Sequence, residues 1–268
     1  MLPFDPAFAY LTLGCVAGFF AGLLGVGGGI IVVPVLSLLF ALQDLPADLV
    51  LPMALGTSMA TILFTSLSSL RAHHRHRAVL WQVVLRFTPG ILVGTGLGTL
   101  LAAHVSGHAL SVFFVAFMLF VAFQMLANVR PAPSRGLPGA PGLAGAGVCI
   151  GTLSSLVAIG GGALTVPFLV WCNVRPHQAI GTSAAVGFPI ALGGTAGFII
   201  NGLAKPHLPA HAAGFIFLPA LAWILAASLL TAPLGARLAH RLPVGVLKRV
   251  FAGLLLVLAA HMLYRLYR

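Results

Sequence analysis

Eight long apolar segments, separated by short polar connections, limit what this chain can fold into. About 20 consecutive apolar residues let a helix cross the hydrocarbon core of a bilayer. The segments therefore predict an all-α polytopic membrane protein. They cover residues 6–42, 49–70, 78–103, 109–127, 143–172, 179–203, 212–236 and 244–264.

Composition and charge agree with a membrane location. Hydrophobic residues make up 60% of the chain and charged residues only 6%, whereas a soluble domain carries about 25% charged residues. A net charge of +11 would suggest nucleic acid in a soluble protein. Here the basic residues lie between apolar segments, as the positive-inside rule predicts for cytoplasmic loops. We therefore expect the lipid bilayer as a partner and no nucleic acid.

The first and fifth segments are too long for single spans, and each contains three consecutive glycines. These are Gly27-Gly28-Gly29 and Gly160-Gly161-Gly162, and four residues separate each cluster from Pro34 or Pro167. Glycine permits a sharp turn at no steric cost. We expect each segment to break there, with helices restarting at about Ile30 and Ala163. The prolines are expected to keep those helices short or kinked.

The two halves of the chain repeat one another. The glycine and proline pattern recurs at a constant offset, "ALGTS" at 54–58 recurs as "AIGTS" at 179–183, and Met125-Leu126 recurs as Met262-Leu263. Ordered matches of this kind indicate internal duplication. We infer two four-segment repeats, 1–128 and 143–268, joined by a cytoplasmic linker at 129–142.

Basic loops indicate how the repeats are oriented. Residues 71–77 follow the second segment and residues 237–249 follow the seventh, so eight simple spans would place these loops on opposite sides. Both become cytoplasmic if the fifth segment is a hairpin that enters and leaves on that side. The repeats would then be inverted, with both chain termini outside. The alternative is parallel repeats with long tilted helices, which Arg265 and Arg268 favour.

The glycine clusters do not form a dinucleotide-binding fingerprint. Neither copy completes G-x-G-x-x-G, and Ala158 stands where the first copy has Gly25. The duplicated "G-G-G" with a following proline, and the duplicated "A-x-G-T-S", instead resemble the sulfite exporter TauE/SafE family of bacterial membrane transporters. The resemblance covers essentially the whole chain. It implies a multi-pass protein of the bacterial inner membrane that exports sulfite or a related small organosulfur anion.

An oxyanion inside a bilayer needs fixed hydrogen-bond donors, and the backbone amides at a helix N-terminus supply them. We predict a substrate site between the repeats, with hydroxyl groups of the neighbouring helices as further donors. Helix packing is the alternative role for the glycines, and bonding back to their own helix is the alternative for the hydroxyls. The predicted site residues are Gly27, Gly28, Gly29, Thr57, Ser58, Gly160, Gly161, Gly162, Thr182 and Ser183.

Other small or polar residues receive structural interpretations. Gly14, Gly18 and Gly22, like Gly90, Gly94 and Gly98, are spaced by four, which is typical of close helix packing. Arg86 is expected to anchor its helix at the interface, with an anion gate as the alternative. The histidines of 71–77 lie among arginines, and the three cysteines have no metal-ligand spacing, so no metal or cofactor is predicted.

The scarcity of acids limits the mechanism. Asp5, Asp44 and Asp48 are the only carboxylates, and all lie outside the apolar cores. Without an intramembrane carboxylate, we expect alternating access by rocking of the two halves, driven by membrane potential and concentration. No G-x-S-x-G is present, so we do not expect an enzyme. A non-transporting membrane scaffold, or a transporter of a different small solute, is the alternative function.

Overall fold

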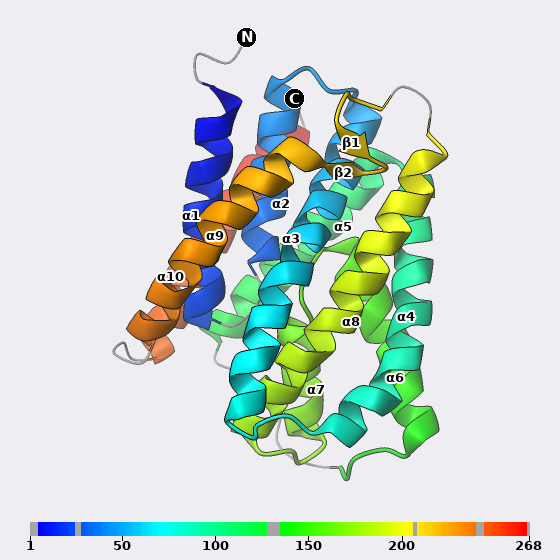
Figure 1. Ribbon diagram of the computed structural model, residues 1–268, viewed down its shortest axis with the longest axis vertical. Coiled ribbons are helices and arrows are strands. Elements are labelled where there is room, and N and C mark those ends of the chain that lie inside the picture. The colour runs from blue at the N-terminus through cyan, green and yellow to red at the C-terminus, as the bar shows by residue number, and fades with distance from the viewer. Residues whose placement is uncertain (1–4, 25–27, 128–134, 206–207, 240–243, 267–268) are drawn as a thin grey trace.

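The computed structural model describes residues 5–24, 28–127, 135–205, 208–239 and 244–266 (Figure 1). Within these ranges the chain forms ten helices and one two-stranded antiparallel sheet. The elements are α1 (Pro6–Leu24), α2 (Gly29–Leu42), α3 (Ala47–Arg75), α4 (Trp81–His104), α5 (Gly107–Leu126), α6 (Ala140–Leu156), α7 (Gly162–Trp171), α8 (Pro176–Leu203), β1 (Ala212–Ala213), β2 (Ile216–Phe217), α9 (Leu218–Ala239) and α10 (Val244–Leu266).

Six of the described helices are long and apolar enough to span a membrane, namely α3, α4, α5, α8, α9 and α10. The other four are shorter apolar helices that come in two consecutive pairs. The first apolar segment folds as α1 and α2, and the fifth as α6 and α7. The predicted helix breaks at the triple glycines are therefore confirmed, with restarts at Gly29 and Gly162.

Some boundaries differ from the sequence-based expectation. The basic stretch at 71–77 is mostly helical, because α3 has no Pro or Gly after Gly56 and continues to Arg75. Residues 212–217 form the small sheet, because Gly214 turns the chain at φ 59° between its strands. Pro34 lies inside α2, which has 14 residues, and Pro167 lies inside α7, which has 10 residues. Both helices are short, and the predicted part of the prolines in this stays a prediction.

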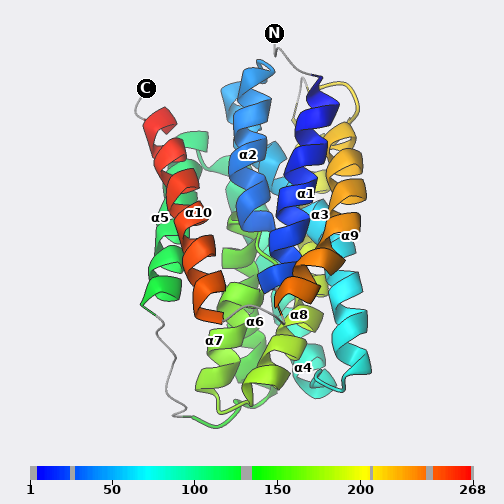
Figure 2. The same cartoon turned by 90° about the vertical axis from the view of Figure 1, so that its left-hand side faces the viewer.

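The broken segments point in opposite directions along the bundle. In Figure 2, α1 descends from the upper end and α2 returns to that end, whereas α6 rises from the lower end and α7 returns to it. The long helices α3 and α8 lie side by side in the centre and also run in opposite directions. Helix α1 begins, and α10 ends, at the upper end.

Charges are distributed unequally between the two ends. All three acids are exposed and belong to the upper end, where α1 begins and the α2–α3 connection lies. Most described basic residues belong to the lower end, and from the positive-inside rule we expect this end to face the cytoplasm. The exposed lower-end residues are Arg71, Arg75, Arg77, Arg86, Arg135, Arg175 and Arg249.

Cysteine labelling is expected to separate the two ends. In a variant that lacks Cys15, Cys149 and Cys172, a cysteine at Asp44 should react with an impermeant thiol reagent added outside the cell. A cysteine at His76 or at Arg249 should react only after the membrane is opened, because both lie at the basic end. Labelling of His76 and Arg249 from opposite sides would contradict this topology.

Close helix contacts join the two sequence halves. Helix α1 packs on α9, and α6 packs on α4. A Cβ atom added to Gly14 would lie 2.6 Å from the carbonyl oxygen of Ile224, and one on Gly94 would overlap the carbonyl of Val148. Glycine is required at such crossings because the backbones approach within the space of one methyl group. The predicted packing role is confirmed for Gly14, Gly18, Gly90, Gly94 and Gly98.

Candidate functional site

The two helix breaks meet in the middle of the molecule. Gly28 and Gly161 cap α2 and α7, each with φ 71°, which is the left-handed conformation. A Cβ atom on Gly29 would overlap the carbonyl oxygen of Ala158, and it would lie 3.0 Å from Ser58 Oγ. The predicted site residue Gly27 lies outside the described residues. The first break therefore touches both the second break and α3.

The second break is a tight turn rather than a row of free amides. The N–H of Gly161 donates to the carbonyl of Ile159 at 2.9 Å, and that of Gly162 to Gly160 at 2.8 Å. The N–H of Ala163 has no acceptor among the described residues. Ala158 adopts a left-handed φ of 47°, which is strained for a residue with a Cβ atom. Two of the expected glycine donors are thus already engaged, and Ala163 provides a free one.

Buried hydroxyls without partners occur on the broken helices and on the central helices α3 and α8. Ser58 and Ser183 are fully buried, and within the described part of the chain neither Oγ atom makes a hydrogen bond. The same holds for Ser154 at the end of α6 and Thr165 in the first turn of α7. An unsatisfied buried hydroxyl costs about 1–3 kcal/mol. Ser58 Oγ lies 3.0 Å from the Cβ position of Gly29, and Thr165 Oγ1 lies 3.5 Å from that of Gly161. Unsatisfied hydroxyls beside both turns indicate a place where a polar ligand completes the hydrogen bonding.

Sequence reasoning missed Ser154 and Thr165. Both flank the second glycine cluster, Ser154 one turn before Ala158 and Thr165 one turn after Gly161. That position is the signal that would have identified them. Thr195, further along α8, is a fifth buried hydroxyl without a partner among the described residues.

The two threonines of the repeated motif bind backbone of the opposite repeat. Thr57 Oγ1 accepts a hydrogen bond from the N–H of Phe217 at 3.0 Å, just before α9 begins. Thr182 Oγ1 accepts one from the N–H of Leu80, also at 3.0 Å, just before α4 begins. Their predicted contact with substrate stays a prediction, because these bonds already use one lone pair of each oxygen.

The glycine of the same motif permits these bonds. A Cβ atom on Gly56 would lie 2.5 Å from the carbonyl oxygen of Phe215, and one on Gly181 would lie 2.5 Å from that of Ala78. In both repeats the contacted residue comes two positions before the one whose N–H binds the threonine. The motif "G-T-S" therefore provides, in order, space for a crossing backbone, an acceptor for its N–H, and a free hydroxyl.

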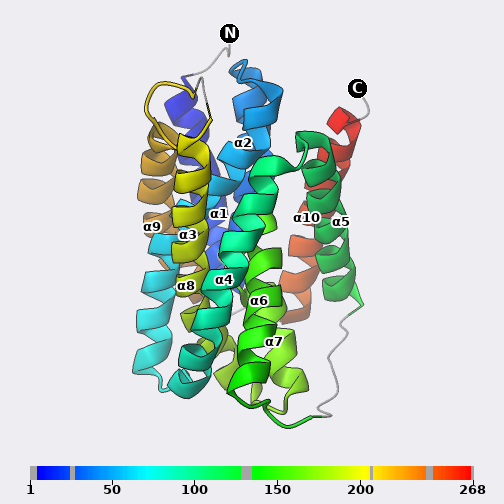
Figure 3. The same ribbon diagram turned by 90° about the vertical axis from the view of Figure 1, so that its right-hand side faces the viewer.

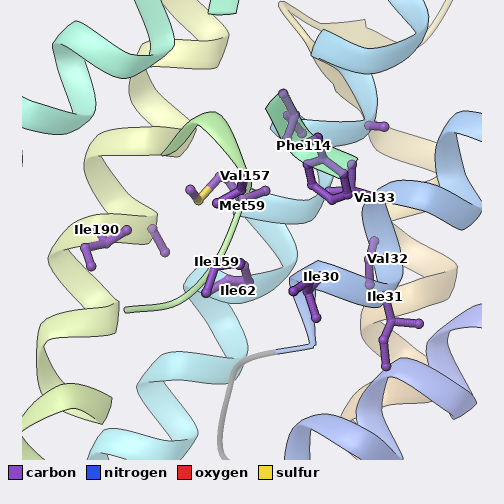
Figure 4. Packing of buried hydrophobic residues seen from close by; sticks show 14 of the residues in the cluster. Ile30, Ile31, Val32, Val33, Met59, Ile62, Phe114, Val157, Ile159 and Ile190 are labelled. Atoms are coloured by element: carbon purple, nitrogen blue, oxygen red, sulfur yellow. The ribbon is translucent and has the colours of Figure 1, made fainter. Parts of the chain in front are cut away.

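Apolar side chains enclose the meeting point of the breaks. Figure 4 shows Val157 beside Met59, and Ile159 beside Ile62, with Ile30 near the start of α2. All five side chains are buried. Charged groups are absent from both described turns, and a ligand there would leave water for an apolar shell with a few fixed hydrogen-bond partners.

Two cavities open from the two ends of the bundle. The lower one, about 370 Å³, reaches Gly160 of the second break and is lined along α3 by Thr65, Ser66, Ser68, Ser69 and His73. The upper one, about 600 Å³, lies between α2, α3, α5 and α10 and reaches Pro34. It contains Asp48, His108, His261 and Arg265. The lower cavity therefore connects the lower end of the bundle with the candidate site.

Comparisons with known proteins agree with this architecture. The chain is 36% identical over 254 residues to a probable membrane transporter protein of Haemophilus influenzae, covering 94% of this chain and 96% of that protein. It is 31% identical over 217 residues to the probable membrane transporter protein YunE of Bacillus subtilis, covering 72% and 78%. No solved structure matches. The family model for the sulfite exporter TauE/SafE matches residues 10–262, and the chain therefore belongs to the TauE/SafE family of membrane transporters.

Proposed function

We propose that this protein exports a small sulfur oxyanion, such as sulfite or a related organosulfonate, by alternating access. The anion would bind at the meeting point of the two helix breaks. The observation that carries the proposal is the contact of Gly29 with Ala158 beside the unpartnered Ser58 hydroxyl. A binding site shared by two broken helices at a repeat interface is a recurring transporter solution.

The site offers the hydrogen-bond donors that a dehydrated oxyanion requires. Ser58, Ser183, Ser154 and Thr165 each have a hydroxyl hydrogen to donate, and Ala163 has a free N–H. The start of α7 adds a partial positive charge of about half an elementary charge. A neutral donor set of this kind favours a monovalent or partly protonated anion over one with a higher charge, because no fixed cation offsets the desolvation.

The open cavity supports loading of the substrate from the lower end. Gly160 is partly accessible through the lower cavity, whereas Gly28 and Gly29 are buried. We place the cytoplasm at this end, so the described conformation is the one that loads substrate from inside the cell. The hydroxyl-rich α3 wall supplies polar contacts along the entry path.

The helix directions support an inverted relation between the two repeats. Helices α1 and α2 form a hairpin from the upper end, α6 and α7 form one from the lower end, and the threonine bonds are exchanged reciprocally. An inverted pair of repeats can present the same site alternately to either side. A membrane scaffold would have no need for unpartnered hydroxyls around a central break.

Energy coupling by a buried carboxylate has no candidate residue. The chain has three acids, all exposed. An inside-negative potential of about 100 mV supplies about 2.3 kcal/mol per charge, which drives roughly a fifty-fold gradient of a monovalent anion. We therefore propose export driven by potential and concentration.

Counterflow in proteoliposomes tests the function. Sulfite, sulfate, thiosulfate, sulfoacetate and taurine would each be offered against an internal pool. We expect exchange of at least one sulfur oxyanion, a response to potential without any sodium gradient, and a pH dependence that follows protonation of the anion. An absolute requirement for sodium, or no exchange of any of the five, would contradict the proposal.

A further inference from the structure

Each side of the bundle is a pair of helices that comes from both repeats. Helix α1 of the first repeat packs on α9 of the second, and α6 of the second packs on α4 of the first (Figures 1 and 3). The contacts are close, since a Cβ atom on Gly14 would lie 2.8 Å from Ala227 Cβ. Helices α3 and α8 lie between these two pairs. Neither pair belongs to one sequence half.

The threonine bonds attach each pair to the central helices at one end only. Thr57 on α3 is hydrogen-bonded to the residue just before the N-terminus of α9, in the upper part of the bundle. Thr182 on α8 is hydrogen-bonded to the residue just before the N-terminus of α4, in the lower part. The far ends of α9 and α4 point toward the lower and upper ends of the bundle, respectively, away from these bonds.

The packing beyond the two threonine bonds can be compared at corresponding positions. Counted from the residue that donates to the threonine, Thr95 on α4 corresponds to Ala232 on α9. Counted from the threonine itself, Gly193 on α8 corresponds to Ser68 on α3. In the upper part, a Cβ atom on Gly193 would lie 3.2 Å from Thr95 Cβ, so α4 is closed onto α8.

In the lower part the equivalent positions line a cavity. Ser68 on α3 and Ala232 on α9 both line the cavity of about 370 Å³. Leu229 lines it too, and its counterpart Leu92 lies 3.3 Å from the Cβ position of Gly193. The same joint is therefore closed on one side of the molecule and open on the other.

We propose that these two mixed pairs, rather than the two sequence halves, are the moving gates of the transporter. The α1/α9 pair closes the cytoplasmic side and the α4/α6 pair closes the outer side. Each swings about its threonine bond, so Thr57 and Thr182 are positioning residues. The inference rests on the proposed function for the substrate, but the exchange of open and closed joints is testable without any substrate.

Engineered disulfides at the corresponding positions test the gates. In a variant without native cysteines, Thr95→Cys/Gly193→Cys should form a disulfide in membranes, because the Cβ separation of 3.2 Å is near the usual 3.5–4.5 Å. Ser68→Cys/Ala232→Cys should also form one, although these residues line an open cavity here. Failure of the second pair to join while the first joins would overturn the alternation of gates, whatever the protein transports.

Transport measurements with the same variants identify the moving parts. Each oxidised gate pair should lower counterflow at least tenfold, with recovery on reduction. A disulfide within a gate, between facing positions of α1 and α9 other than the crossing glycines, should leave counterflow within twofold of its own reduced form. A bridge between α4 and α6 that likewise avoids Gly90, Gly94 and Gly98 serves as a second such control. Loss of counterflow on oxidising a bridge within a gate would overturn the inference in favour of rocking sequence halves.

Substitution of the threonines tests the positioning role. Thr57→Val should slow disulfide formation between Ser68→Cys and Ala232→Cys at least fivefold and leave the Thr95→Cys/Gly193→Cys pair unchanged. Thr182→Val should do the reverse, and Thr57→Ser should restore the normal rate because it keeps the hydroxyl. A general structural role would slow both pairs equally, and that result would overturn the assignment of Thr57 and Thr182. The wild-type protein could exchange no anion while both cysteine pairs form disulfides as described. That result would contradict the proposed function but would leave the assignment of the gates intact.

Discussion

Replacing Gly28 or Gly161 by Val is expected to reduce transport at least a hundredfold while the protein still inserts into the membrane. Both positions have φ 71°, a conformation that is unfavourable by about 1–2 kcal/mol for an ordinary L-residue and is an outlier for a β-branched one. The new Cβ atom would also lie 3.0 Å from the carbonyl oxygen of Ala17 or from Ile190 Cδ1. Both turns would shift away from the site.

Gly96→Val is the matched control for these variants. Gly96 lies in the middle of α4, and a Cβ atom added there meets nothing within 4 Å. Initial rates of counterflow should be compared at equal amounts of inserted, monodisperse protein. If Gly28→Val and Gly161→Val transport normally, or if both lose folded protein to the same extent, the glycines serve packing alone.

Ser58→Ala and Ser183→Ala are expected to raise the KM for the anion about 10- to 100-fold. A hydrogen bond to a charged group contributes about 1.5–3 kcal/mol, and each 1.4 kcal/mol corresponds to a factor of ten. The thermal stability of the substrate-free protein should be unchanged or higher. Neither hydroxyl has a partner among the described residues. Replacing the serine by alanine therefore removes an unsatisfied buried polar group and its energetic cost.

Ser228→Ala distinguishes a ligand from a general effect of losing a buried hydroxyl. Ser228 on α9 is also buried, but its hydroxyl donates to the carbonyl of Ile224 at 2.6 Å. Its removal should leave the KM within twofold. Equal KM values for Ser58→Ala, Ser183→Ala and the wild type would remove both serines from the site.

The helix breaks could be predicted from sequence because two independent signals coincide there. Residues 6–42 and 143–172 are too long for single spans, and each contains the one local sequence that turns without steric cost. Close packing at Gly14, Gly18, Gly90, Gly94 and Gly98 was likewise readable from spacing by four. The serines of the repeated motif were predicted as site residues because duplication marks positions that both repeats use, and their role stays a prediction.

The pairing of α1 with α9 and of α4 with α6 could not be read from the sequence. Spacing of glycines tells which face of a helix is narrow, but not which other helix fills it. The bonds of Thr57 to Phe217 and of Thr182 to Leu80 join residues more than 100 positions apart, and the donors are backbone groups that every residue carries. The start of α9 was also placed too early, because the turn at Gly214 depends on a tertiary contact with Ile199.

Anomalous diffraction from crystals soaked with selenite tests the central claim most directly, because selenite has the shape and charge of sulfite and selenium can be located without ambiguity. We expect one selenium peak between the two helix breaks, with its oxygens within hydrogen-bonding distance of Ser58 Oγ and Ser183 Oγ, and loss of that peak in the Ser58→Ala/Ser183→Ala double variant. A selenium peak only in the upper cavity beside His108, His261 and Arg265, or one that persists in the double variant, would contradict a site shared by the two breaks.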